Sequence, residues 1–224
     1  MVISSFGTLI VFAKRPRLGH VKTRLQREVG VSNAAKIYSL LLRKTLATSE
    51  KVTSLCRVIM PADLSDVAWF MSRYSARGWH VRGQRGETLG KRMEEALIEV
   101  GDPRLPKILI GSDIVNFRSN DLLEALSKLG LPGSIVLGPA VDGGYWLIGT
   151  NGLLPDIFGD MGWGSSSVFG NTITSLDRQR IDYDLVGQRQ DIDRPSDLRR
   201  TNGWLRRKLN RLRWPGAPRV TKFW

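Results

Sequence analysis

Residues 8–25 read Thr8-Leu-Ile-Val-Phe-Ala-Lys-Arg-Pro-Arg-Leu-Gly-His-Val-Lys-Thr-Arg-Leu25. The first six residues form an apolar run that predicts a buried strand. A loop with five cations, at positions 14, 15, 17, 22 and 24, follows directly. In doubly wound α/β sheets, ligands bind outside the carboxyl ends of the strands. A basic, glycine-containing loop there is suited to hold phosphates by charge and backbone N–H groups. The spacing alone leaves a solvated charge run equally open.

Outside this stretch, short apolar runs alternate with helical patterns. Continuous apolar strands that alternate with helices are typical of a mostly parallel sheet covered by helices on both faces. Ser32 and Asp63 are predicted to cap the first two helices. The predicted strands cover residues 57–60, 79–81, 107–110, 134–137 and 145–148, and the predicted helices cover 32–49, a segment from Asp63, 87–100 and 119–130.

Length and composition narrow the class of protein. The chain has 224 residues, 42% apolar and 25% charged, which fits a soluble α/β domain and excludes disordered and fibrous classes. The single cysteine, Cys56, excludes an internal disulfide. Two histidines argue against a His-rich metal site. The early apolar run over residues 6–13 is too short to span a membrane, and no positive charge precedes it as in a signal peptide. We therefore expect a cytoplasmic protein.

Two aspartates follow predicted strands. Asp113 ends the segment Gly111-Ser-Asp113, where a carboxylate can bind Mg²⁺ or Mn²⁺ or cap a turn or helix. Asp142 begins Asp142-Gly-Gly-Tyr145. Its two glycines let the backbone approach a ligand closely, and Asp-Gly is also a strong hairpin signal. Both interpretations of Asp142 can hold together.

A third acidic motif lies near the C-terminus. It reads Asp191-Ile-Asp-Arg-Pro-Ser-Asp-Leu198. Pro195 fits the first turn of a helix, so Asp193 can either cap that helix or bind a metal. Taken alone, the motif favours capping.

Five segments in this order carry a family resemblance. They are Phe12–Leu25, Gln84–Met93, Gly138–Gly149, the aromatic stretch Phe158–Val168, and Asp191–Leu198. The chain resembles the bacterial GT-A-fold nucleotide-diphospho-sugar transferases of the arsenosugar-biosynthesis glycosyltransferase type. The last segment is similar to the ending shared with molybdenum-cofactor nucleotidyltransferases.

The resemblance implies a fold and a reaction. The fold would be a GT-A (Rossmann-like) three-layer αβα sandwich with a mostly parallel mixed sheet over residues 1–198. The reaction would be metal-dependent glycosyl transfer from a nucleotide-diphospho-sugar to a small-molecule or lipid acceptor. The alternative is a nucleotidyltransferase that joins a nucleoside triphosphate to an acceptor and releases pyrophosphate. The basic loop favours the alternative, and the resemblance favours glycosyl transfer.

The resemblance also implies site residues. Asp113 and Asp193 would hold Mg²⁺ or Mn²⁺, and Asp142 would act with Lys22 and Arg24 in catalysis. The nucleotide and its phosphates would be bound by Lys14, Arg15, Gly19, Lys22, Arg24, Gln84 and Gly86. The substrate would be contacted by Gly143, Gly144, Tyr145 and Trp163. The family usually has a proline two residues after its strand-end aspartate, where this chain has Val115, so the loop beside the metal site is expected to differ.

The net charge of +13 is concentrated at the C-terminus. Residues 199–224 contain seven Arg, two Lys and no acid, and we expect them to form a separate basic, amphipathic tail. Trp204, Leu205, Leu209 and Leu212 would share one side of a helix. That stripe can pack on the domain, which is the favoured interpretation. Residues 203–224 can also lie on anionic lipid at the inner membrane face. Binding of nucleic acid through phosphates is the least favoured of the three.

Overall fold

The computed structural model describes residues 6–152, 154–201 and 203–209. It contains a seven-stranded sheet in the order β3-β2-β1-β4-β7-β6-β8. Only β7 runs antiparallel to its neighbours, so the sheet is mixed and mostly parallel. The strands are β1 (Gly7–Ala13), β2 (Leu55–Pro61), β3 (Trp79–Val81), β4 (Lys107–Ile110), β6 (Ile135–Pro139), β7 (Tyr145–Thr150) and β8 (Tyr183–Leu185).

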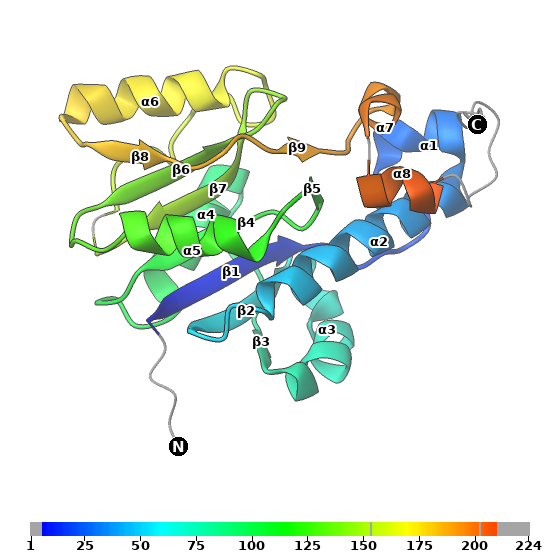
Figure 1. The fold of residues 1–224 in the computed structure, drawn as a ribbon, viewed down its shortest axis with the longest axis horizontal. Coiled ribbons are helices and arrows are strands. Elements are labelled where there is room, and N and C mark those ends of the chain that lie inside the picture. Colours follow the sequence, from blue (N-terminus) through cyan, green and yellow to red (C-terminus); the bar gives the residue numbers. More distant parts are fainter. Residues whose placement is uncertain (1–5, 153, 202, 210–224) are drawn as a thin grey trace.

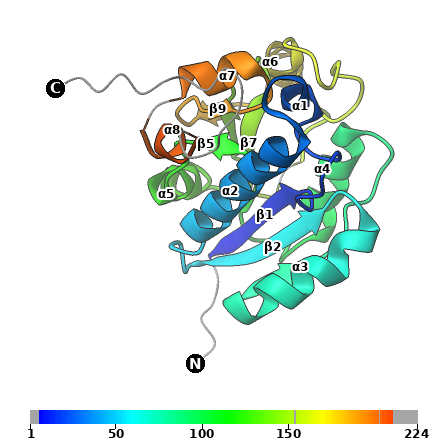
Figure 2. The same cartoon turned by 90° about the vertical axis from the view of Figure 1, so that its right-hand side faces the viewer.

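Helices cover both faces of this sheet (Figures 1 and 2). Successive side chains of β1 point to opposite faces. Leu9 and Val11 therefore pack with α2 (Val31–Ser49), α3 (Val67–Tyr74) and α5 (Ser119–Lys128). On the other face, Ile10 packs with α4 (Leu89–Glu99) and α6 (Val168–Gln179). These layers confirm the predicted three-layer αβα sandwich.

A second, smaller unit of structure lies at one end of the sheet. The short strands β5 (Ile114–Val115) and β9 (Gln190–Asp191) pair antiparallel, with Ile114 opposite Asp191. Val115 is buried and lies opposite Gln190. A proline at position 115 would have no N–H to give to such a ladder. Val115, in place of the family's usual proline, is therefore compatible with the pairing of β5 and β9.

Three short helices complete this end of the molecule (Figure 2). They are α1 (Thr23–Val29), α7 (Pro195–Arg200) and α8 (Gly203–Leu209). Leu205 and Leu209 of α8 are buried in one cluster with Leu25, Ile37 and Leu198. This part of the tail's apolar stripe thus packs on the domain, as the favoured interpretation expects. Leu212 and the side chain of Trp204 lie outside the described residues. Among the described residues, no helix combines the length and apolar character of a membrane span.

Several helix boundaries differ from the predictions. Ser32 does not cap α2, because α2 begins at Val31 and its N-cap is Gly30. The separate helix α1 before it was not predicted. Asp63 does cap, as predicted: its side chain accepts the N–H of Ser65 at the start of a 3₁₀ turn (Leu64–Asp66) before α3. A second 3₁₀ turn (Ser75–Arg77) follows α3.

Candidate functional site

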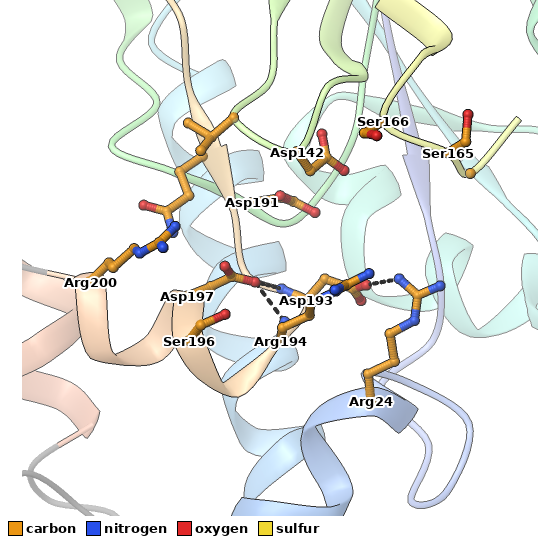
Figure 3. A pocket seen from close by; sticks show the side chains of 13 residues that line it. Arg24, Asp142, Ser165, Ser166, Asp191, Asp193, Arg194, Ser196, Asp197 and Arg200 are labelled. Atoms are coloured by element: carbon orange, nitrogen blue, oxygen red, sulfur yellow. Dashed lines mark hydrogen bonds and ion pairs between the residues drawn. The ribbon is translucent and has the colours of Figure 1, made fainter.

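A cavity of about 600 Å³ lies beyond the carboxyl ends of β1 and β4. The basic loop forms one wall through Lys14 and Lys22, and Asp113 and Asp193 lie on other segments that line it. A neighbouring cavity of about 540 Å³ shares Asp142 and Asp193 with the first (Figure 3). The structure therefore brings three of the predicted aspartates and the basic loop to the edge where an α/β sheet binds its ligands.

Lys22 connects the basic loop to the carboxylates. Its backbone is left-handed, with φ 50°, at the N-cap of α1. The side chain is only 5% exposed, and its Nζ donates to Asp113 Oδ2 at 2.5 Å and lies 4.0 Å from Asp193 Oδ1. Burial acts to lower the pKa of Lys22, but the charge and hydrogen bond of Asp113, helped by Asp191 and Asp193, raise it above its ordinary value. Lys22 is therefore held as a cation between acids.

Arg24 joins the same network. It is the second residue of α1, and its Nη1 donates to Asp193 Oδ2 (Figure 3). Lys22 and Arg24 thus lie on one short segment and face the same carboxylate. The predicted catalytic cations and predicted metal ligands are neighbours in space.

The carboxylate of Asp193 is available because another residue caps α7. Asp197 Oδ2 accepts the backbone N–H groups of Asp193 at 3.0 Å and Arg194 at 2.6 Å (Figure 3). Pro195 begins α7, as predicted. The interpretation that Asp193 caps this helix is therefore wrong, since Asp197 supplies the cap. The side chain of Asp193 faces Lys22 and Arg24 instead.

Asp113 does not cap a helix either. It lies between β4 and β5, and its Oδ2 accepts the Lys22 hydrogen bond. Tyr38 of α2 braces this turn: its hydroxyl accepts the backbone N–H of Lys14 at 2.7 Å and lies 2.8 Å from Ser112 Oγ. Burial, and next the charge of Asp113, raise the pKa of Tyr38 far above its usual range. The neutral phenol therefore ties the basic loop to the turn that carries Asp113.

Asp142 sits in the connection between β6 and β7. Its Oδ1 accepts the N–H of Gly144 at 3.0 Å, and the strands pair antiparallel. Gly143 has φ 91°, and a Cβ added there would lie 2.1 Å from the carbonyl oxygen of Ser166. Its own carbonyl accepts the N–H of Phe169 at 2.9 Å. The hairpin prediction is confirmed, and the turn still exposes Asp142 to both cavities.

Sequence reasoning missed Asp191. The β5–β9 pair sets it beside the turn that holds Asp113, and Figure 3 shows its side chain near that of Asp142. Burial raises the pKa of Asp191 to about 7, reinforced by the charges of Asp113, Asp142 and Asp193 and opposed by Lys22. The carboxyl group of Asp191 therefore interacts electrostatically with those of the three predicted aspartates. The available signal was the doublet Asp191-Ile-Asp193, of which only the second member was singled out.

A cation of α4 was also missed. Arg92 lines the main cavity, and its Nε donates to the Gly86 carbonyl at 2.9 Å. Gln84 lines the cavity too and donates to the Met60 carbonyl at 2.7 Å. The Leu-Gly-x-Arg-Met pattern within residues 84–93 carried the signal for Arg92.

The structure does not bring every predicted residue to the main cavity. Arg15 lies 3.6 Å from Asp66 and 5.3 Å over the ring of Trp69, and it lines a separate cavity of about 170 Å³. Gly19 and Gly86 have positive φ but do not line the main cavity. Gly144, Tyr145 and Trp163 line a third cavity of about 200 Å³, whereas Gly143 is not among its lining residues and lies close to the Ser166 carbonyl.

The carboxylates fit a metal that is shared with a ligand. Among the described residues, no group of three or more His, Cys, Asp or Glu side chains forms a ready-made metal site. Mg²⁺, however, is usually bound through one or two carboxylates together with substrate phosphates. The hard oxygen atoms of Asp113 and Asp193, both about one-third exposed, match that chemistry.

Comparisons with known proteins agree with this architecture. Residues 45–165, more than half of the chain, match the family described as "Uncharacterized protein conserved in bacteria (DUF2064)". A provisionally assigned nucleotide-diphospho-sugar transferase from Desulfovibrio desulfuricans is 28% identical, with a TM-score of 0.77; the match covers 93% of this chain and 96% of that one. No curated protein matches the chain.

Two more distant structures share the fold. A nucleotidyl transferase from Methanothermobacter thermautotrophicus is 11% identical, with a TM-score of 0.57 over 91% of this chain and 99% of that one. Glucosyl-3-phosphoglycerate synthase from Mycobacterium tuberculosis, solved with Mn²⁺, uridine diphosphate and phosphoglyceric acid, is 12% identical, with a TM-score of 0.50 over 86% and 72%. The chain therefore belongs to the DUF2064 family and is a transferase with the GT-A-like fold of nucleotide-sugar transferases and nucleotidyltransferases.

Proposed function

We propose that this protein is a metal-dependent glycosyltransferase that uses a nucleotide-diphospho-sugar donor. The observation that carries the proposal is the pairing of Lys22 and Arg24 with Asp113 and Asp193 at the rim of one cavity. Cations and carboxylates in such contact can bind a diphosphate together with a divalent metal. The name of the Desulfovibrio relative and the Mn²⁺ and uridine diphosphate bound by the mycobacterial synthase support this choice.

The donor would bind along the basic wall of the main cavity. Lys14 and Arg92 line it, and among the described residues neither forms an ion pair. Their charges are thus available to the diphosphate. Lys22 and Arg24 would exchange their carboxylate partners for phosphate oxygens. A divalent cation held by Asp113 and Asp193 would supply Lewis-acid stabilisation of charge on the leaving diphosphate.

In the proposed transfer step, Lys22, Arg24 and Asp142 have separate roles. An acceptor hydroxyl oxygen forms a bond to the anomeric carbon, while the bond from that carbon to the diphosphate oxygen breaks. The nucleoside diphosphate leaves with the electron pair, and Lys22 and Arg24 stabilise its charge. The hydroxyl proton passes to a carboxylate, for which Asp142 is our candidate because it borders every cavity of the site.

Nucleotidyl transfer is the second candidate. It is favoured by the five cations in residues 14–24, since a pyrophosphate leaving group carries more negative charge. Two of these cations, however, Arg15 and Arg17, are paired with Asp66 and line a separate small cavity. The loop therefore has less uncompensated charge than its sequence suggests. We accordingly rank glycosyl transfer first.

The leaving group decides between these two reactions. The protein is incubated with Mn²⁺ or Mg²⁺, a panel of acceptor alcohols, and either nucleotide sugars or nucleoside triphosphates. Glycosyl transfer predicts release of nucleoside diphosphate from the sugar donors. Release of pyrophosphate from triphosphates, with no nucleoside diphosphate from sugar donors, would refute it. An Asp142→Asn variant should lose turnover, whereas Asp182→Asn, at an exposed loop position, serves as its matched control.

We further propose that residues 203–224 of the basic tail add peripheral contact with anionic lipid. Leu205 and Leu209 face the core, while Arg207 and Lys208 are exposed. Contact would therefore depend on charge and would weaken with salt. Sedimentation with phosphatidylserine vesicles should fall in an Arg207→Glu/Lys208→Glu variant and should be absent with neutral vesicles. Equal sedimentation of the variant and the parent protein would refute the contact.

A further inference from the structure

The third cavity of the site has a different character from the other two. It holds about 200 Å³, and its apolar lining includes Met93, Tyr145, Trp146, Trp163 and Val168; we call it the aromatic pocket. These residues come from α4, β7, the loop before α6, and α6 itself. The pocket is smaller than the 300–1,000 Å³ of typical ligand sites, so it suits one ring-sized group.

The polar atoms of the two indoles are already satisfied. Trp146 Nε1 donates to the Gly187 carbonyl at 3.1 Å, and Trp163 Nε1 donates to the Gly159 carbonyl at 2.8 Å. The rings of Tyr145 and Trp163 meet edge to face, with centroids 6.3 Å apart. The pocket therefore offers a ligand mainly the carbon surfaces of these rings.

One polar atom among these residues stands out. The Tyr145 hydroxyl is buried and has no hydrogen-bond partner among the described residues. A buried hydroxyl without a partner costs free energy, so native proteins rarely keep one. Because this oxygen is itself buried, a ligand could pair with it only after neighbouring side chains shift, so the hydroxyl is not taken as a ligand contact.

Carboxylates line the pocket where it meets the main cavity, and we call this side its rim. Asp113, Asp142 and Asp191 line the aromatic pocket. Two of these, Asp113 and Asp142, also line the main cavity, where the donor would bind. Asp113 is paired with Lys22, whereas Asp142 and Asp191 form no ion pair among the described residues and would repel an anionic ligand. A sugar would bring many hydroxyls, which the apolar lining could not pair. The apolar lining and the acidic rim of the pocket together fit an uncharged molecule that has an apolar part and one hydroxyl at the rim.

We propose that the aromatic pocket is the acceptor subsite and binds the apolar, ring-sized part of an uncharged alcohol or phenol. This inference rests on the proposed function, because an acceptor has meaning only beside a donor. The acceptor hydroxyl lies at the rim, near Asp142 and the donor cavity. Hydrophobic burial supplies the affinity, and the carboxylates select against acids.

Binding of phenol tests the inference without turnover. The indole N–H signals of Trp146 and Trp163, assigned with Trp→Phe variants, are followed by NMR as phenol is added to the full chain. Phenol should shift both signals to saturation, while benzoate, its anionic analogue, and glycerol, its polar counterpart, should not. Failure of phenol to shift either signal, or equal binding of benzoate, would overturn the proposal.

Two variants locate the binding. Val168→Phe fills the pocket and should weaken phenol binding at least tenfold, whereas Leu131→Phe, at a side chain that is 74% exposed, should not change it. If Val168→Phe does not fold, Val168→Leu is used: it takes up less of the pocket and should weaken phenol binding several-fold while keeping the fold. Unchanged phenol affinity in the folded pocket variant would overturn the proposal.

Donor binding is measured on the same samples. Stabilisation by a nucleoside diphosphate and Mn²⁺ should be the same in Val168→Phe and Leu131→Phe. Donor binding without phenol binding would overturn the acceptor subsite and leave the proposed function standing. Phenol binding in a protein that binds no nucleotide would overturn the proposed function, and the acceptor role with it.

Discussion

Lys22 Nζ lies 2.5 Å from Asp113 Oδ2 and 4.0 Å from Asp193 Oδ1, with its side chain almost fully buried. An internal cation thus neutralises the two carboxylates that would hold a metal. A metal that entered alone would have to displace Lys22 and leave its charge buried without compensation. A metal that arrives with a diphosphate brings phosphate oxygens for Lys22 to bind. Under the proposed function, the arrangement would therefore couple metal binding to nucleotide binding.

Removing the Lys22 side chain should make metal binding independent of nucleotide binding. Lys22→Met takes away the competing cation, so Mn²⁺ alone should bind about tenfold tighter, which corresponds to about 1.4 kcal/mol. The same variant should bind nucleoside diphosphate more weakly. Separate calorimetric titrations with Mn²⁺ and with nucleoside diphosphate measure the two affinities, and Lys36→Met on the exposed side of α2 is the control. Weaker or unchanged binding of Mn²⁺ to Lys22→Met would contradict the coupling.

Asp113→Asn should affect both stability and metal dependence. It keeps the shape of the side chain but removes the charge opposite the buried Lys22. We expect the free energy of unfolding to fall by about 1–3 kcal/mol, the range for a lost charged hydrogen bond. Nucleotide binding should lose its response to Mn²⁺. Urea unfolding and a metal titration test these expectations, and unchanged results in both would show that the pair is not important.

Asp197→Ala should act through Asp193. Without the Asp197 carboxylate, the N–H groups of Asp193 and Arg194 lose their acceptor. Loss of such a cap costs about 0.5–2 kcal/mol, and the displaced Asp193 should weaken Mn²⁺ binding in the presence of nucleotide. Asp197→Asn keeps an acceptor oxygen and should restore most of both quantities. An Ala variant as stable and as metal-responsive as the parent would argue against this positioning role.

Gly143→Ala should damage the turn that carries Asp142. Its φ of 91° disfavours a side chain, and the added Cβ would meet the Ser166 carbonyl. We expect a destabilisation of more than about 1 kcal/mol, seen as a lower melting temperature. Gly170→Ala in α6, where no atom lies within 4 Å of the added Cβ, should have no effect or stabilise. Equal stability of the two variants would be inconsistent with the close approach.

Most of the central sheet could be predicted, because its strands are continuous apolar runs. Strands β1, β2, β3, β4, β6 and β7 match the predicted runs to within two residues at each end. The two-residue strands β5 and β9 could not be predicted, since two residues have no periodicity. Their pairing places Asp191 in the site, and so the missed strand and the missed carboxylate have one cause.

Site residues could be predicted where they lie in recognisable motifs. Their ion-pair partners could not be predicted where those partners are distant in the sequence. Asp113 and Asp142 follow β4 and β6, parallel strands of the main sheet whose carboxyl ends lie at one edge, and Asp193 reaches the same cavity because it follows β9 of the two-stranded sheet. Arg15 was assigned to phosphate from its position in the basic loop. Its ion pair with Asp66 depends on the packing of the turn before α3, which charge counting does not show.

Metal-dependent binding of a nucleoside diphosphate is the most direct test of the central claim. Melting temperatures are measured with UDP, GDP, CDP or ADP, each with and without Mn²⁺, for the parent protein and Asp113→Asn. We predict that at least one nucleotide raises the melting temperature of the parent only when Mn²⁺ is present, and that Asp113→Asn loses this response. No stabilisation by any nucleotide, or equal stabilisation without metal and in the variant, would contradict the account.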